Sequence, residues 1–131
     1  LKVAEENKRK HGAKVNFIND DILNTKVNFK NAQVIVSNPP YIRSSQIPSL
    51  DKTVKDAEPY GALDGGEDGL EFYKKISSLA AENLALGGAI FFEIGYEQGD
   101  AVKLILEQQG FKNIQVIKDY NGNNRVVSAI K

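Results

Sequence analysis

At 131 residues the chain has room for one domain, because domains usually take about 100–200 residues. Its hydrophobic share of 41% allows a buried core, and equal numbers of basic and acidic residues (17 each) disfavour a protein that grips DNA phosphates. The absence of cysteine excludes disulfides, and the single histidine, His11, disfavours a zinc site, so no metal is expected. With no membrane span or signal peptide in the sequence, we expect a soluble cytoplasmic protein that contacts neither membrane nor nucleic acid.

The first part of the chain is predicted to form a helix and two strands. Residues 1–12 have the spacing of an amphipathic helix that ends at a glycine. Residues 13–21 (AKVNFINDD) indicate a short strand that ends in acids. Residues 32–38 (AQVIVSN) are apolar on both faces, which is typical of a strand buried in a parallel sheet.

The middle of the chain is predicted to be a long loop followed by a helix. Residues 37–69 are rich in Pro, Ser, Asp and Gly, and loops of this length in a compact domain are usually functional. Residues 69–88 repeat apolar side chains at a spacing of three to four and end in two glycines, which predicts a helix. Residues 89–95 (AIFFEIG) predict a second buried strand.

The last third of the chain predicts a helix and a hairpin. Residues 97–111 have helical spacing, and strands at 113–119 and 125–131 are joined by a tight Asn-Gly turn. The sequence of elements indicates an α/β fold with a mostly parallel sheet and a C-terminal antiparallel hairpin. In such sheets ligands bind at the carboxyl ends of the strands, where the NDD, SNPPY and EIG segments lie.

The stretch Asn38-Pro39-Pro40-Tyr41 directly follows a predicted strand. Proline cannot donate to a sheet ladder, so the strand must stop there, and a residue before proline is held extended. The Asn38 side chain and the Pro39 carbonyl can then form a rigid pair of acceptors beside the Tyr41 ring. Such a pair suits a planar NH₂ group, either an amide or a nucleobase amine. Alternatively, the stretch only ends the strand and turns the chain.

Four segments together resemble the HemK/PrmC family of release-factor glutamine N5-methyltransferases. They are VSNPPYI, EPYGALDGGEDGLEFYKKI, LGGAIFFEIGYEQG and DYNGNNRVVSAI, and they extend over most of the chain. The resemblance implies a Rossmann-like S-adenosylmethionine-dependent methyltransferase fold. It also implies methylation of a glutamine side-chain amide nitrogen in peptide chain release factors, which would be the partners.

The resemblance assigns roles to the four residues after the strand. Asn38 and Pro39 would hold the substrate nitrogen through a side-chain oxygen and a backbone carbonyl. Pro40 would complete the pocket, and Tyr41 would pack on the substrate amide.

The resemblance also implies a cofactor site for S-adenosylmethionine. Asp21 and Ile22 would flank the adenine, and Asn38 would contact the cofactor as well as the substrate. For Asp21 a helix N-cap or a solvated acid is the open alternative.

Five other polar residues are interpreted more simply. Glu58 would lie near the mouth of the site, whereas Glu67 and Asp68 suit a turn and a helix N-terminus. Glu93 either faces the site or anchors loop backbone. Arg125 is expected to tie down the last hairpin.

Compared with the family pattern, residues 1–131 look like a single partial catalytic domain. The first two strands, the glycine-rich cofactor loop and the helical N-terminal domain have no counterpart. The strand at 13–21 would then lose its neighbour, and the strand at 32–38 would become an exposed apolar edge. We therefore expect this chain alone to be inactive.

Two other functions stay open. An adenine-N6 methyltransferase on DNA or RNA would use the same acceptor pair for a flipped base, although the zero net charge disfavours it. A non-catalytic binding remnant is the alternative from a different class.

Overall fold

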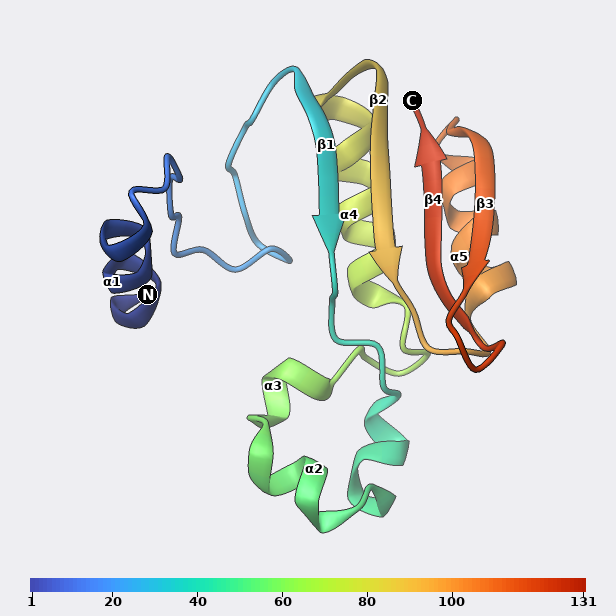
Figure 1. Cartoon of the computed structure of the whole chain (residues 1–131). Coiled ribbons are helices and arrows are strands. Elements are labelled where there is room, and N and C mark those ends of the chain that lie inside the picture. The colour runs from blue at the N-terminus through green and yellow to red at the C-terminus, as the bar shows by residue number, and fades with distance from the viewer.

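The computed structural model describes residues 1–131 and contains a four-stranded sheet in the order β1-β2-β4-β3 (Figure 1). These strands are β1 (Ala32–Ser37), β2 (Leu84–Glu93), β3 (Lys112–Lys118) and β4 (Asn124–Ile130). The strand β1 is parallel to β2, and β4 is antiparallel to both of its neighbours. The predicted α/β class and C-terminal antiparallel hairpin are confirmed, but the sheet is mixed rather than mostly parallel, because only the β1–β2 pair is parallel.

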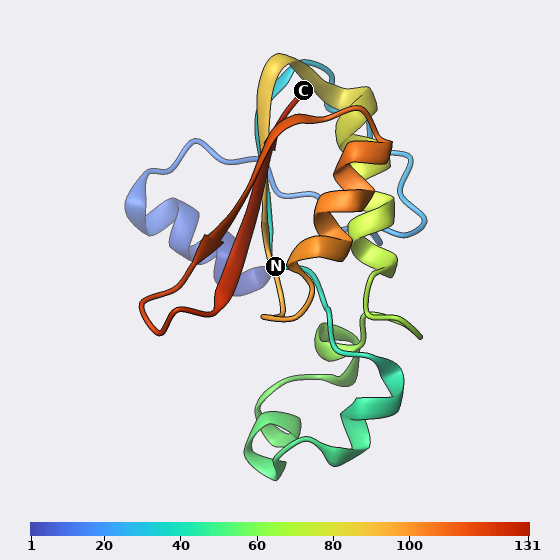
Figure 2. The ribbon, with the colours of Figure 1, turned by 90° about the vertical axis from the view of Figure 1, so that its right-hand side faces the viewer.

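Two helices, α4 (Glu71–Asn83) and α5 (Gly99–Gln108), cover one face of the sheet (Figure 2). Both are amphipathic and turn their apolar sides to the strands, which is how helices at 3.6-residue spacing build a core. At the centre, the rings of Tyr73 and Phe92 meet edge to face with 5.2 Å between centroids. The core consists of Tyr73, Ile76, Ala80, Leu84, Ile90, Phe92, Ile94, Val102, Ile105, Leu106, Phe111, Val127 and Ala129.

The strand β1 is one of the two outer strands of the sheet, and two of its apolar side chains are open to solvent. Val34 is 56% exposed and Val36 is 75% exposed. Figure 2 shows α4 and α5 on one side of the sheet and α1 (Lys2–His11) on the other, and α1 buries no residue. The predicted exposed apolar edge is thus confirmed.

The helix α1 (Lys2–His11) agrees with the sequence, but the strand predicted for residues 13–21 is absent. The helix ends at Gly12, which has a φ of 61°, and buries no residue. After it, the chain runs without regular structure, and the Lys8 ammonium lies 5.7 Å from the centre of the Phe17 ring. The prediction was wrong because a strand needs a neighbouring backbone to pair with, and none lies beside this segment.

Two further boundaries differ from the prediction. The long loop contains a 3₁₀ helix η1 (Ser44–Ser49) and two short helices, α2 (Lys52–Ala57) and α3 (Tyr60–Leu63). The helix α4 ends at Asn83, and the chain continues directly into β2. No helix in the structure combines the length and the apolar character that crossing a membrane requires.

Candidate active site

The stretch from Asn38 to Tyr41 lies where β1 ends, as the two prolines require. Beside it is a cavity of about 390 Å³. Its lining combines the four predicted residues with apolar side chains from α2 and α3 and two carboxylates. These residues are Asn38, Pro39, Pro40, Tyr41, Ile42, Val54, Glu58, Ala62, Leu63 and Glu93.

Both predicted acceptors are free of partners within the chain. The Asn38 side chain is exposed and makes no hydrogen bond, and the Pro39 carbonyl accepts none. By contrast, the Tyr41 carbonyl accepts a hydrogen bond from the Gln98 side chain at 3.0 Å. Two oxygens are therefore available at the cavity for donors of a ligand.

The loop is anchored on one side by the end of α3 and the residues that follow it. The Ile42 amide donates to the Leu63 carbonyl at 3.1 Å, and the Gly65 amide donates back to the Ile42 carbonyl at 2.8 Å. The approach is so close that a Cβ atom on Gly65 would lie 2.7 Å from the Tyr41 Cα atom. Only glycine fits at this position without moving backbone.

A carboxylate fixes the turn that carries this anchor. The Ser44 hydroxyl donates to Asp64 Oδ1 at 2.6 Å, and the Gly66 amide donates to the same oxygen at 3.0 Å. Because both bonds favour the ionised carboxylate, they lower the pKa of Asp64, with Ser44 as the larger cause.

On the other side the loop is anchored by Gln98, a residue that the sequence analysis did not single out. Its Nε2 atom donates to the carbonyls of Tyr41 and Gly69, each at 3.0 Å. Its Oε1 atom accepts from the Gly95 amide at 3.0 Å and lies 3.5 Å from the hydroxyl of Tyr73. The only sequence signal was its position just before α5, at the same sheet edge as the candidate site.

A second cavity, of about 320 Å³, lies across the two prolines from the first. Pro39 and Pro40 line both cavities and so form the wall between them. Ile22 also lines this second cavity, and most of the other residues that line it are apolar. The lining consists of Ile22, Phe29, Ile35, Val36, Ser37, Pro39, Pro40, Phe72, Ile76 and Leu79.

Asp21 does not line either cavity. Its carboxylate is exposed and accepts from the Leu23 amide at 3.0 Å and from the Asn24 side chain at 2.6 Å. These bonds build a local turn, as aspartate often does. The structure therefore brings Ile22 to the proline wall and leaves Asp21 outside it.

The two glutamates of the first cavity come from different elements. Glu93 is the last residue of β2 and faces the cavity that Asn38 lines, while its own carbonyl accepts from the Tyr73 hydroxyl at 2.9 Å. Glu58 follows α2 and lines the same cavity. Of the two alternatives for Glu93, the structure thus favours the one in which its side chain faces the site.

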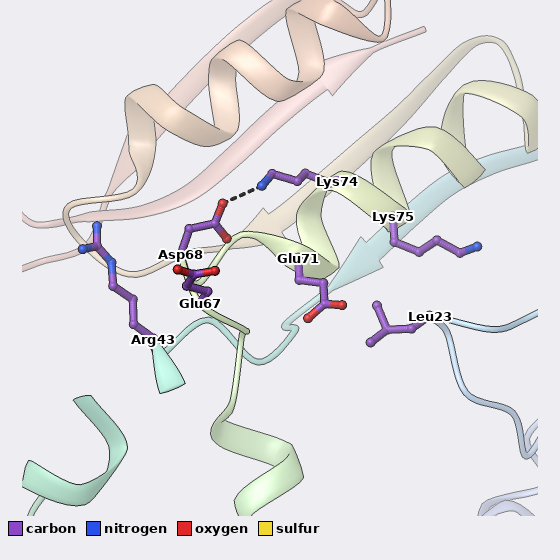
Figure 3. A pocket seen from close by; sticks show the side chains of 7 residues that line it. All are labelled: Leu23, Arg43, Glu67, Asp68, Glu71, Lys74 and Lys75. Atoms are coloured by element: carbon purple, nitrogen blue, oxygen red, sulfur yellow. Dashed lines mark hydrogen bonds and ion pairs between the residues drawn. The ribbon is translucent and has the colours of Figure 1, made fainter. Parts of the chain in front are cut away.

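The Asp68 carboxylate, in the turn before α4, makes hydrogen bonds to residues close to it in sequence. Asp68 accepts from the Leu70 amide at 2.9 Å and from Lys74 at 2.5 Å, which lowers the pKa of Asp68 with Lys74 as the larger cause. Figure 3 shows this pair at a polar hollow that Glu67 and Arg43 also line. No three His, Asp or Glu side chains lie together in a way that could hold a metal ion.

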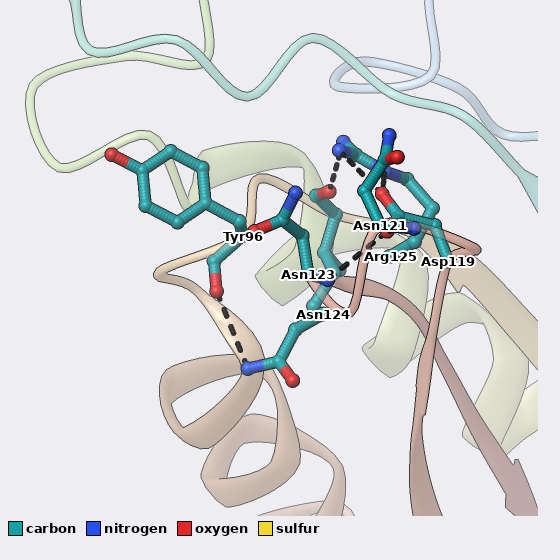
Figure 4. Close-up of polar contacts among 7 residues, drawn as sticks. Tyr96, Asp119, Asn121, Asn123, Asn124 and Arg125 are labelled. Carbon is teal, nitrogen blue, oxygen red and sulfur yellow. Dashed lines mark hydrogen bonds and ion pairs between the residues drawn. The ribbon is translucent and has the colours of Figure 1, made fainter.

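Arg125 has the structural role that the sequence predicted (Figure 4). Its guanidinium donates to Asp119 Oδ2 at 3.2 and 3.3 Å and to the Ile94 carbonyl at 3.2 Å. The hairpin is in this way tied to the end of β2. The amide of Asn123 also donates to Asp119, at 3.0 Å.

No family model matches the chain. Its sequence is 45% identical over 130 residues to a protein of Clostridium botulinum named release factor glutamine methyltransferase, covering 97% of this chain and 46% of that protein. A protein of the same name from Fusobacterium nucleatum is 42% identical over 132 residues, covering 100% of this chain and 37% of the relative.

A solved structure agrees with these sequences. The crystal structure of a release factor-specific protein-(glutamine-N5) methyltransferase from Alicyclobacillus acidocaldarius matches with a TM-score of 0.50 and 30% identity, over 77% of this chain and 49% of that one. This likeness confirms the Rossmann-like methyltransferase fold that the sequence predicted. The chain therefore belongs to the family of release factor glutamine methyltransferases, and it spans less than half the length of these relatives.

Proposed function

We propose that this chain carries the substrate pocket of an S-adenosylmethionine-dependent enzyme that methylates a glutamine side-chain amide nitrogen in peptide chain release factors. The observation that carries the proposal is the pair of acceptors, Asn38 Oδ1 and the Pro39 carbonyl, that have no partner within the chain and lie at one cavity. An NH₂ group offers two donors, so one substrate amide can satisfy both oxygens.

The lining of the cavity fits the rest of a glutamine side chain. Val54, Ala62 and Leu63 offer apolar surface for its methylene groups, and the ring of Tyr41 offers a flat face for the amide plane. Two fixed acceptors orient the nitrogen and stabilise the positive charge that grows on it as the new N–C bond forms. The proton is then lost from a nitrogen that is already hydrogen-bonded to oxygen.

The apolar cavity behind the proline wall fits the adenine side of the cofactor. Ile22 and Phe29 offer apolar contact surface there, in the cavity that Pro39 also lines. When bound, S-adenosylmethionine would supply the methyl group, and Asn38, at the edge of the wall, would contact it. We propose that Asp21 lies at the flank of this cavity and makes no hydrogen bond to the cofactor, because its carboxylate already accepts hydrogen bonds within its own turn.

No residue that lines the apolar cavity is charged, so no ion-pair partner for the amino and carboxylate groups of the cofactor lies there. We propose that residues 1–131 correspond to part of a catalytic domain. We expect the 131-residue chain to bind S-adenosylmethionine weakly or not at all and to be inactive alone. Isothermal titration calorimetry of the chain checks this expectation, which micromolar binding would contradict.

The function itself is tested in a chimera, in which residues 1–131 replace the matched segment of the Clostridium botulinum relative. We expect the chimera to add one methyl group to a glutamine of a recombinant release factor, as measured by peptide mass spectrometry. Asn38→Ala should abolish the transfer. Asn121→Ala is the matched control, since this exposed asparagine lies in the hairpin turn, away from both cavities, and its side chain makes no hydrogen bond. A folded chimera without transfer would contradict the proposal.

A further inference from the structure

Three loops meet at the candidate site, and a single side chain connects them. They are the loop after β1, the glycine-rich turn before α4 and the loop after β2. Gln98 bonds to all three, through Tyr41, Gly69 and Gly95. We propose that Gln98 is a positioning residue that fixes the direction of the Asn38 and Pro39 acceptors, a role that rests on the proposed function.

The amide of Gln98 uses most of its hydrogen-bonding capacity here. Both hydrogens of Nε2 go to backbone carbonyls at 3.0 Å, and Oε1 accepts from the Gly95 amide at 3.0 Å. The Tyr73 hydroxyl, whose hydrogen goes to the Glu93 carbonyl at 2.9 Å, lies 3.5 Å from Oε1. A glutamine has two donors and one oxygen with two lone pairs, so both donors and one of the two lone pairs are used. A side chain used in this way holds its neighbours in one arrangement.

The backbone around Gln98 is shaped to admit this contact. A Cβ atom on Gly69 would lie 2.5 Å from the Tyr41 carbonyl oxygen, and one on Gly95 would lie 2.9 Å from Gln98 Oε1. Both distances are shorter than any allowed contact, so side chains at these two positions would push the loops off the amide. The two glycines are therefore part of the same arrangement.

The anchor acts on the acceptors through a short and stiff piece of chain. Asn38 and Pro39 make no hydrogen bond of their own to hold their oxygens in place. Between them and Tyr41 lie only proline rings, which lock φ at both positions. When Gln98 fixes the Tyr41 carbonyl, few backbone torsions are left through which the Pro39 carbonyl can turn.

Two substitutions at position 98 distinguish loss of the hydrogen-bond donors from loss of the whole amide group. Gln98→Glu keeps the shape but sets a carboxylate against two carbonyls, neither of which it can bind until it takes up a proton, and the protonated acid then has one donor for one of them. Gln98→Met keeps the length and removes donor and acceptor together. Only the first variant should recover part of the wild-type bonding on acidification.

The test uses ¹⁵N nuclear magnetic resonance of the 131-residue chain. We expect Gln98→Glu at neutral pH to lose the wild-type amide shifts of Ile42 and Gly95 and the wild-type shift of the Asn38 side-chain NH₂. As the pH falls, these shifts should return towards those of wild type at the same pH. Gln98→Met should lose them at every pH. The Gly110 amide, beyond the C-terminal end of α5, reports whether the fold itself is intact.

Other ionisable groups surround this position, so wild type is titrated in parallel. They are Tyr41, Arg43, Asp68, Tyr73, Glu93, Tyr96, Glu97 and Arg125. Wild type carries all of them, and any recovery seen only in Gln98→Glu belongs to the new carboxyl group. Unchanged loop shifts in Gln98→Met would overturn the proposal, and so would a loss in Gln98→Glu that acid does not reverse.

A ligand separates this inference from the proposed function. Addition of a glutamine-containing peptide should shift the Asn38 side-chain NH₂ of wild type and leave Gln98→Met unaffected. If wild type does not respond although the pH result holds, the proposed substrate is wrong and the anchoring role of Gln98 stands. If both proteins respond equally, Gln98 does not position the acceptors, and the inference fails.

Discussion

Residues 1–31 and residues 32–131 differ in how their apolar side chains are used. In the first region, Val3 is 69% exposed and Ile18 is 63% exposed, and α1 buries nothing. In the second region, the core cluster between α4, α5 and the sheet includes side chains with no exposure at all, such as Phe92 and Val127. Apolar spacing is present in both regions, but of the first region only Ile22 packs against the core.

An apolar pattern therefore becomes a strand only where a second backbone exchanges hydrogen bonds with it. Residues 32–37 pair with β2, whereas residues 13–21 pair with nothing. The candidate site follows the same division. Asn38 to Tyr41 leave a paired strand and are anchored on two sides, while Asp21 closes an exposed turn.

The largest loss of stability is expected when an aromatic ring is removed from the core of the second region. Phe92→Ala should lower the free energy of unfolding by about 3–5 kcal/mol, because a buried ring is replaced by a cavity. Urea denaturation followed by circular dichroism measures the loss. Val3→Ala is the control from the first region, with an expected change within about 0.5 kcal/mol. Equal effects of the two variants would contradict the division.

A smaller effect tests whether the site loop belongs to the packed region. Gly65→Ala should cost about 1–3 kcal/mol, because its Cβ atom would lie 2.7 Å from the Tyr41 Cα atom and the backbone must shift. Gly61→Ala is matched, since a Cβ atom there meets nothing within 4 Å. Differential scanning calorimetry of both variants measures the effect, and a Gly65→Ala protein as stable as Gly61→Ala would place the loop outside the packed region.

The hairpin gives a pH-dependent test. The Asn123 amide, as the largest cause, and the Arg125 guanidinium lower the pKa of Asp119 in the folded chain. Its contribution to stability is therefore present above the unfolded pKa of about 3.9 and is lost as the pH falls through the lower folded value. We expect Asp119→Asn to be less stable than wild type at neutral pH, with the difference shrinking below about pH 4. A difference in denaturation midpoint that is constant with pH would contradict the assignment.

The smallest change in stability is expected when part of the first region is removed. Deletion of residues 1–12 removes α1, none of whose residues is buried. We expect the denaturation midpoint to change by less than the equivalent of about 0.5 kcal/mol, as for surface changes in general. Loss of more than this would show that α1 stabilises the sheet.

The elements of the packed region were largely predictable from the sequence. The spacing in α4 and α5 and the Asn-Gly turn are local signals, and the structure confirms them. The end of α4 was not predictable, because Leu84 and Leu86 continue the helical spacing. Leu84 joins β2 because it pairs with Ala32, a contact between distant parts of the chain.

The candidate site shows the same limit. The two prolines predict, from backbone chemistry alone, that β1 ends there and that Asn38 lies at its end. Gln98 stands in a polar run, and nothing local sets it apart from Glu97. Its importance comes from the Tyr41 and Gly69 carbonyls, which lie far away in sequence and meet it only in the folded chain.

The order of strands in the sheet has a consequence for how the chain folds. The hairpin of β3 and β4 closes over a short turn, whereas β1 reaches β2 only after residues 38–83 are looped out. Closing a long loop costs more chain entropy, and contacts between distant residues slow folding. We therefore expect β1 to dock last. Until it does, the chain has a hydrophobic core and no pocket, so the acceptor pair comes into being in the final step of folding.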